Sequence, residues 1–288
     1  MLFRSGIRTT VFLKGCPLSC EWCHNPEGQS HLPEIIHWAS RCIHCGDCVE
    51  NCPEKAIQII DEIPIRNVDL CNQCGKCVDI CPTGAWEIAG KMMTTNQVLE
   101  RLRKDIIYFD ESGGGVTFSG GEPMLQIDFL TSLLAACKRE GIHTAVDTSG
   151  IAPLEHYARI NSMVDLYLYD IKLMDDCRHR SYTGVSNQRI LKNIAALSKA
   201  GKEIIVRIPI IPGVNDDVDN LTATTNFLLN HTNVRRIDIL PYHHIATPKY
   251  ARLGMAYSLA DLVSPSDEAM NDIVKLLMQQ NFSVKIGG

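Results

Sequence analysis

The sequence of 288 residues has neither a long apolar run nor an excess of basic charge. No segment approaches the roughly 18 consecutive apolar residues that indicate a membrane-spanning helix. Its 28 Lys and Arg are outnumbered by 33 Asp and Glu, and the net charge of −5 argues against nucleic acid as the main partner. Residues 1–6 lack the regions of a signal peptide. We therefore expect a cytoplasmic protein that binds neither a membrane nor nucleic acid.

Cysteine, in contrast, is abundant. The chain has 13 cysteines, and all but Cys137 and Cys177 fall in three tight groups between Cys16 and Cys81. Disulfide frameworks belong mainly to short secreted domains, so clustered cysteines in this chain indicate ligands of a metal or an iron–sulfur cluster. We expect Cys137 to be a buried core residue and Cys177 an ordinary loop thiol.

Eight of these cysteines form two copies of the pattern C-x2-C-x2-C-x3-C-P, which is typical of bacterial ferredoxins with two four-iron clusters. In that arrangement the fourth cysteine of each run binds the other cluster. The expected ligands are Cys42, Cys45, Cys48 and Cys81 for the first auxiliary cluster, and Cys71, Cys74, Cys77 and Cys52 for the second. Two zinc sites are the alternative, but zinc sites do not need this exchange. Residues 38–90 are thus expected to form an inserted ferredoxin-like module.

The first group, Cys16, Cys20 and Cys23, supplies only three thiolates. Three cysteines fill three corners of a four-iron cluster and leave one iron free. That iron can chelate the amino and carboxylate groups of S-adenosylmethionine, which a reduced cluster can cleave to a 5′-deoxyadenosyl radical. The protein's part in such chemistry is to position the cofactor and exclude quenchers. The spacing therefore favours a radical enzyme.

Outside the cysteine-rich segment, strand and helix patterns alternate. The expected strands are residues 8–14, 116–119, 143–147, 166–171, 203–209, 235–240 and 283–286. The expected helices are residues 96–109, 126–140, 153–162, 188–200, 217–230 and 265–280. Such alternation implies a parallel sheet. The expected fold is α/β, a partial (β/α)6 barrel formed by residues 1–37 and 91–288, with an open sheet as the alternative.

Polar residues and glycines follow the expected strands, where parallel β/α folds place their active sites. They are Gly120, Gly121, Glu122, Asp147, Asp170, Lys172, Arg207 and His243. Gly120 and Gly121 would let the backbone approach the cofactor, and Glu122 could accept a hydrogen bond from its ammonium. Lys172 or Arg207 could pair with its carboxylate. Ordinary alternatives are a simple turn for the glycines and a structural ion pair for Arg207.

The segment Gly15–Glu27, GCPLSCEWCHNPE, resembles the signature of the radical S-adenosylmethionine activases of glycyl radical enzymes, the pyruvate formate-lyase activating enzyme family. Matching motifs follow in order as GGEP at 120–123, DTSG at 147–150, DIKLMD at 170–175, YTG at 182–184, RIP at 207–209, PGVND at 212–216 and LPYH at 240–243. The resemblance implies a partial (β/α)6 barrel that removes a hydrogen atom from a backbone glycine of a partner enzyme. The ferredoxin-like insert resembles that of activases of the larger glycyl radical enzymes.

The resemblance also implies roles for single residues. The implied contacts to S-adenosylmethionine are Trp22, Cys23, His24, Gly121, Asp170, Ile171, Lys172 and His243. Asp147 and Asp170 match acids that bind a monovalent cation in a relative. Residues 1–5 do not resemble the Asp-Gly-Pro-Gly segment that usually precedes the first strand.

The expected partners are a glycyl radical enzyme as the protein substrate and flavodoxin or ferredoxin as the electron donor. The auxiliary clusters could relay electrons or shape the docking surface, and we expect a monomer. One alternative is a radical enzyme that oxidises a side chain of another protein. Another is a plain electron carrier, which leaves Cys16, Cys20 and Cys23 unexplained.

Overall fold

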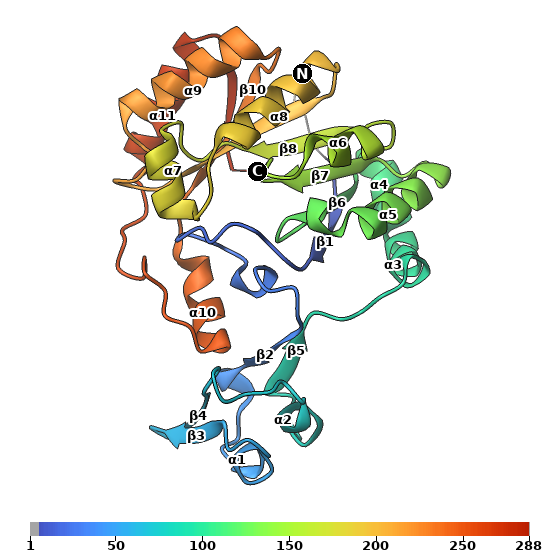
Figure 1. Cartoon of the computed structure of the whole chain (residues 1–288), viewed down its shortest axis with the longest axis vertical. Coiled ribbons are helices and arrows are strands. Elements are labelled where there is room, and N and C mark those ends of the chain that lie inside the picture. The colour runs from blue at the N-terminus through green and yellow to red at the C-terminus, as the bar shows by residue number, and fades with distance from the viewer. Residues whose placement is uncertain (1–5, 288) are drawn as a thin grey trace.

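The structure is a computed structural model that describes residues 6–287, so the atypical segment 1–5 lies outside the described residues. Its centre is a seven-stranded sheet whose neighbouring strands are all parallel and follow chain order (Figure 1). The strands are β1 Arg8–Leu13, β6 Gly115–Gly120, β7 Thr144–Thr148, β8 Leu166–Asp170, β9 Ile204–Ile210, β10 Arg236–Pro241 and β11 Ser283–Ile286. This confirms the predicted α/β class and parallel sheet.

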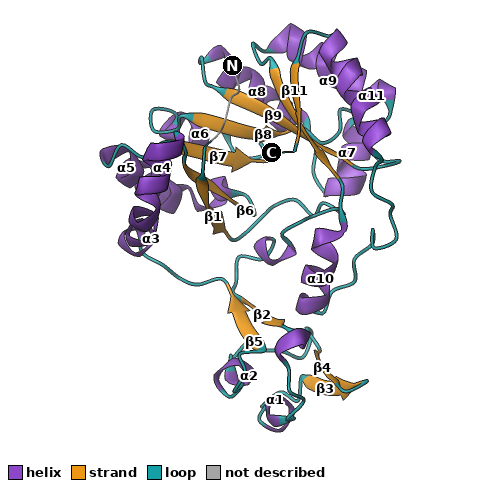
Figure 2. Cartoon of the chain, turned by 180° about the vertical axis from the view of Figure 1, so that it is seen from behind, coloured by secondary structure: helices purple, strands orange, loops and turns teal. Residues whose placement is uncertain are grey.

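Helices pack against the outer face of this sheet (Figure 2). They are α3 Thr95–Leu102, α4 Ile106–Ser112, α5 Ile127–Arg139, α6 Leu154–Ile160, α7 Asp176–Thr183, α8 Gln188–Lys199, α9 Val218–His231 and α11 Asp267–Gln279. A further helix, α10 Thr247–Leu253, lies below the sheet instead. The sheet and most of these helices share one apolar core, and we call them together the sheet domain. The helix expected over residues 96–109 is interrupted, because a 3-10 turn at Arg103–Asp105 separates α3 from α4.

The inner face of the sheet surrounds a cavity of about 560 Å³. Side chains from every strand line it, among them Thr10, Ser119, Asp147, Leu168, Arg207, Asp238 and Lys285. Since alternate residues of a strand point to one face, the sheet must curve around this space. Strands β1 and β11 each have a single neighbour, so the curved sheet is open between them.

Residues 34–89 form a separate cysteine-rich lobe below the sheet domain (Figure 1). Its elements are β2 Glu34–His37, α1 Asp47–Glu50, β3 Ile57–Ile60, β4 Ile63–Arg66, α2 Lys76–Asp79 and β5 Trp86–Ala89. The antiparallel pairing of β2 with β5 begins the lobe at Glu34, upstream of the expected start at residue 38. Gly46 and Gly75 precede the two short helices with φ of 86° and 79°, a conformation that suits glycine.

No helix among residues 6–287 is long and apolar enough to span a membrane.

Candidate active site

The loop that follows β1 carries the three-cysteine group and is fixed by backbone hydrogen bonds. The N–H of Gly121 donates to Leu13 O at 2.8 Å, and the N–H of Glu122 donates to Gly15 O at 2.7 Å. A Cβ atom on Gly121 would lie 2.2 Å from Gly15 O and 2.4 Å from Gly28 O. Glycine is therefore required here because the end of β6 packs against the chain's own loop. Gly120 and Gly121 nevertheless both line the cavity, as the sequence led us to expect.

Cys16, Cys20 and Cys23 all line the same cavity and are partly exposed. Burial raises the pKa of Cys16 to about 11 and that of Cys20 to about 12, which leaves both protonated at neutral pH. Binding of a metal centre would deprotonate them. Burial also raises the pKa of Cys23, although the backbone of Asn25 and the side chain of Gln29 oppose the shift. The chemistry of this donor set suits iron.

His24 follows the cysteines and also lines the cavity. Its ring lies 4.5 Å from that of His243, centroid to centroid. Burial, together with the charges of His243 and Lys249, lowers the pKa of His24 to about 4, so the ring is neutral. Its Nε2 atom is buried without a hydrogen-bond partner. A buried polar atom without a partner is costly, and a polar ligand in the cavity would satisfy it.

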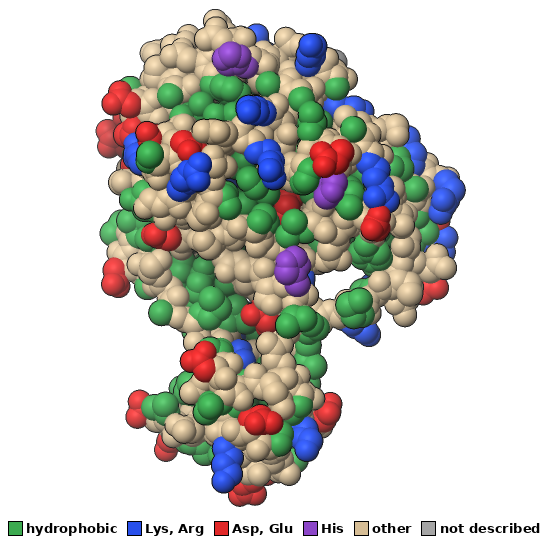
Figure 3. All heavy atoms as spheres, in the orientation of Figure 1, with side chains coloured by type: hydrophobic (Ala, Val, Ile, Leu, Met, Phe, Trp, Pro, Cys, Tyr) green, Lys and Arg blue, Asp and Glu red, His purple; other side chains and the backbone are tan. Residues whose placement is uncertain are grey.

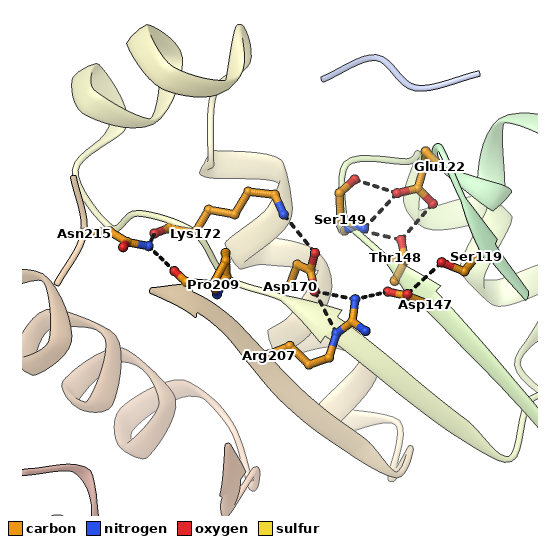
Figure 4. Close-up of polar contacts among 11 residues, drawn as sticks. Ser119, Glu122, Asp147, Thr148, Ser149, Asp170, Lys172, Arg207, Pro209 and Asn215 are labelled. Carbon is orange, nitrogen blue, oxygen red and sulfur yellow. Dashed lines mark hydrogen bonds and ion pairs between the residues drawn. The ribbon is translucent and has the colours of Figure 1, made fainter. Parts of the chain in front are cut away.

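A network of charged side chains crosses the ends of β7, β8 and β9 (Figure 4). The guanidinium of Arg207 donates to Asp147 and, at 2.9 and 3.0 Å, to Oδ1 of Asp170. Lys172 Nζ donates to the other Asp170 oxygen at 2.8 Å, and Ser119 Oγ donates to Asp147 Oδ2 at 2.8 Å. Arg207 therefore pairs with both of the acids that the resemblance assigns to a monovalent cation.

The pKa values of the two acids of this network are shifted in opposite directions. Burial raises the pKa of Asp147, although Arg207 opposes the shift. Burial alone would also raise the pKa of Asp170, but Arg207 and Lys172 hold it below the ordinary value. Burial would lower the pKa of Lys172, yet Asp170 and the nearby Cys20 keep it above its ordinary value. Lys172 therefore stays charged beside the cysteine loop.

Glu122 does not face the cavity. It is fully buried and accepts hydrogen bonds from Thr148 Oγ1 at 2.8 Å, from both Ser149 N and Oγ, and from Met124 N at 3.2 Å (Figure 4). The expectation that its carboxylate meets the ammonium of S-adenosylmethionine is therefore corrected: Glu122 joins the end of β6 to the end of β7. Thr148 and Ser149 were not recognised as its partners, because nothing local in the sequence pairs residues so far apart.

Of the other residues predicted to contact the cofactor, Trp22 lines the cavity, whereas the side chains of Ile171 and His243 do not. Trp22 lines the cavity, but its ring is buried in a small apolar cluster with Leu173 and Tyr242. Ile171 belongs to the main core at 2% exposure, so only its backbone is near the site. His243 is exposed at the start of the segment that leads to α10. Lys172 is held by Asn215, which donates to the Lys172 carbonyl at 2.8 Å.

Two hollows in the cysteine-rich lobe are lined by the remaining clustered cysteines. One is lined by Cys42, Cys45, Cys48 and Cys81. The other is lined by Cys71, Cys74, Cys77 and Cys52. The fourth cysteine of each run thus lies with the first three of the other run, the grouping that the sequence pattern predicts.

No three His, Cys, Asp or Glu side chains within residues 6–287 gather closely enough to hold a single metal ion.

Comparison with known proteins bears directly on this site. The family model of the Radical SAM superfamily matches residues 10–223. The trans-4-hydroxy-L-proline dehydratase activating enzyme of Clostridioides difficile is 44% identical over 285 residues, covering 98% of this chain and 94% of the relative. The chain belongs to the glycyl radical enzyme activating enzymes of the Radical SAM superfamily.

Other activating enzymes agree with this assignment. The choline trimethylamine-lyase activating enzyme of Oleidesulfovibrio alaskensis is 38% identical, covering 98% of this chain and 93% of the relative. The crystal structure of a domain of a pyruvate-formate lyase-activating enzyme from Bacteroides vulgatus is 35% identical, with a TM-score of 0.51, and covers 61% of this chain and 99% of that one. The alternative of an enzyme that oxidises a side chain is not favoured by these relatives.

Proposed function

We propose that Cys16, Cys20 and Cys23 hold a four-iron cluster whose free iron binds S-adenosylmethionine in the sheet-domain cavity. The observation that carries this proposal is the convergence of all three cysteines on a cavity ringed by the polar ends of the parallel strands. When bound, the cluster and S-adenosylmethionine together supply the 5′-deoxyadenosyl radical that takes a hydrogen atom from a partner glycine.

The chain's own residues would bind and orient S-adenosylmethionine. Lys172, which stays charged next to Cys20, is suited to its carboxylate. The unpartnered Nε2 of His24 and the cavity-lining backbone of Gly121 offer further polar contacts. Arg207 already neutralises Asp147 and Asp170, so it acts in this proposal as a structural pair, and no monovalent cation is included.

The partner's glycine would reach the cavity through the open side between β1 and β11. Phe12 of β1 is 59% exposed and lines the cavity, as does Lys285 of β11. A polypeptide loop could therefore pass between the two edge strands without disturbing the sheet. Which glycyl radical enzyme supplies that loop is not given by similarity, since relatives with 33–44% identity carry names of dehydratases, lyases and decarboxylases.

Residues 34–89 would hold the two auxiliary four-iron clusters, as a ferredoxin-like module. The grouping of four cysteines around each hollow supports the exchanged ligand sets. We propose that these clusters relay electrons from flavodoxin or ferredoxin to the cluster on Cys16, Cys20 and Cys23. Replacing Cys45 with Ala should then slow turnover with the natural donor while the active-site cluster remains.

The direct test is electron paramagnetic resonance of a reduced, anaerobic mixture of the protein, S-adenosylmethionine and the glycyl radical enzyme encoded beside it. We expect a glycyl doublet that is absent with the Cys20→Ser variant and with a partner whose glycine is changed to alanine. A fully iron-loaded protein that cleaves S-adenosylmethionine but never yields the doublet would contradict the proposal.

A further inference from the structure

The cysteine-rich lobe is joined to the sheet domain through a narrow neck, beside an opening between the two parts (Figure 3). The two chain connections, before Glu34 of β2 and after Ala89 of β5, leave the same end of this antiparallel pair. Near them, Lys14 Nζ donates to Glu34 Oε2 of β2 at 3.1 Å. Outside the lobe, α10 is the helix that packs against β2, although it follows β10 far along the chain (Figures 1 and 2).

One face of α10 contacts the cysteine loop of the active site. Lys249 Nζ donates to Asn25 Oδ1 at 2.6 Å and to Glu27 Oε1 at 2.8 Å. Asn25 follows Cys23 by two residues in the same loop. Lys249 therefore contacts the loop that carries a proposed ligand of the active-site cluster. Nothing in the local sequence singles it out, and it was not among the predicted site residues.

The same face of α10 also contacts the lobe, because Lys249 and Arg252 are three residues apart in this helix. The guanidinium of Arg252 lies 3.6 Å from the ring centre of Trp38, just after β2. Arg66, at the end of β4 and only 9% exposed, donates to the carbonyl of Leu253 at 3.2 Å. The guanidinium of Arg41 also lies over the Trp38 ring, 4.4 Å from its centre. Arg41, however, belongs to the lobe itself.

We propose that α10 is a tie between the lobe and the active-site loop, with Lys249 and Arg252 as positioning residues that hold an auxiliary cluster at a fixed place relative to Cys23. The consequence for electron transfer rests on the proposed relay function, whereas the tie itself rests only on the contacts above. Without the tie, two chain connections and the Lys14–Glu34 pair would be left to fix the lobe.

The first test compares Arg252→Gln with its matched control Arg41→Gln by hydrogen–deuterium exchange of the iron-loaded protein. Both changes remove a cation from the ring of Trp38, but only the first breaks the contact with α10. We expect faster exchange by about 5- to 30-fold in β2 and α10 of Arg252→Gln, the range for loss of a partly desolvated cation–π contact. The control should not change α10, and Arg252→Lys should restore most of the protection.

Equal exchange of α10 in Arg252→Gln and Arg41→Gln, with iron content unchanged in both, would overturn the tie. If the Gln variant loses iron, Trp38→Leu provides the same comparison from the lobe side. Protection retained in α10 in an iron-loaded Trp38→Leu protein would likewise overturn it.

The second test separates the tie from the relay. Cleavage of S-adenosylmethionine by Arg252→Gln is measured with dithionite, a small reductant that can reach the active-site cluster directly, and with the protein donor. A rate that falls only with the protein donor supports both proposals. Faster exchange with no loss of the donor-driven rate would keep the tie and overturn the relay function.

Discussion

The sheet domain and the cysteine-rich lobe are held together in different ways. The sheet domain has a large core of aliphatic and aromatic side chains, and its buried charges are paired with one another. The small core of the lobe consists of Ile35, Ile57 and Trp86 together with Cys48 and Cys77. Two of its five buried members are thus proposed cluster ligands. The comparison teaches that the core of the sheet domain contains no proposed ligand, whereas the lobe is expected to depend on the clusters proposed for its cysteines.

The surface of the lobe supports this conclusion. The hairpin of β3 and β4 leaves Ile59 and Ile60 more than half exposed, at 53% and 51%. Apolar residues on the surface of so small a unit cannot contribute to its core. Units of this size have a marginal core and often add disulfides or metals for stability, and the free energy of metal binding then becomes folding free energy.

Removal of iron should produce the largest difference in stability between the lobe and the sheet domain. Anaerobic chelation should abolish protection from hydrogen exchange throughout residues 34–89, because the lobe loses the proposed clusters that two of its five buried core residues bind. Strands β6 to β10 should remain protected, since their core contains no ligand. Equal loss of protection in both regions, or in neither, would show that the two regions are not stabilised differently.

Two buried cysteines, one in each region, distinguish a proposed cluster ligand from an ordinary core residue. Cys77 is 8% exposed in the lobe, and Cys137 is fully buried in the sheet domain. Cys77→Ser should cost one of three clusters, so that bound iron falls by about a third. Cys137→Ser should keep all iron and lose about 1–3 kcal/mol of stability from burying a hydroxyl. Iron analysis and urea unfolding measure the two effects, and iron loss in Cys137→Ser would contradict the assignment.

A change in the charged network should lower the stability of the sheet domain without affecting the lobe. Arg207→Met would leave Asp147 and Asp170 buried without their shared partner. Breaking a buried pair in this way typically costs about 3–5 kcal/mol. We expect a lower midpoint of urea unfolding for strands β7 to β9, with auxiliary iron unchanged. The matched control is Arg159→Met, which removes a partner of the exposed Asp128 and should cost less than about 1 kcal/mol.

The smallest expected effect concerns Asp165, just before β8. Burial alone would raise its pKa, but the Thr144 N–H at 2.8 Å and Lys138 hold the pKa of Asp165 below its ordinary value. Because the folded pKa is the lower one, the carboxylate stabilises the fold above about pH 4 and loses this effect as the pH falls through the folded pKa. Asp165→Asn should therefore be less stable than the wild type at pH 7, with the difference shrinking toward pH 3. A difference independent of pH would contradict the ionic role.

Much of the sheet domain was predictable because its signals are local. Buried strands such as Ile204–Ile210 form short apolar runs, and the long helices show an apolar stripe. The cysteine groups were equally readable, since ligand spacing is set within a few residues. By contrast, α7 has the polar sequence DCRHRSYT without such a stripe, and its existence was missed. The pairing of β2 with β5 was also missed, because it joins four-residue strands that lie far apart in the sequence.

The roles of single site residues were harder to predict than their presence at the site. Asp170 and Arg207 are neighbours because the register of β8 and β9 places them opposite each other. Sequence analysis assigned both to S-adenosylmethionine, with an ion pair only as the alternative for Arg207, since register cannot be read from either strand alone. Glu122 was misassigned for the same reason: its partners lie at the end of another strand, where they bury and saturate the carboxylate.

The most direct measurement of the central claim follows one hydrogen atom. The partner enzyme is prepared with glycine deuterated at the α-carbon, and the 5′-deoxyadenosine formed with the reduced protein and S-adenosylmethionine is examined by mass spectrometry. We predict that deuterium from the glycine appears in the methyl group of the 5′-deoxyadenosine as the glycyl radical forms. If 5′-deoxyadenosine forms in the presence of the partner but carries no deuterium, the protein does not take its hydrogen atom from that glycine.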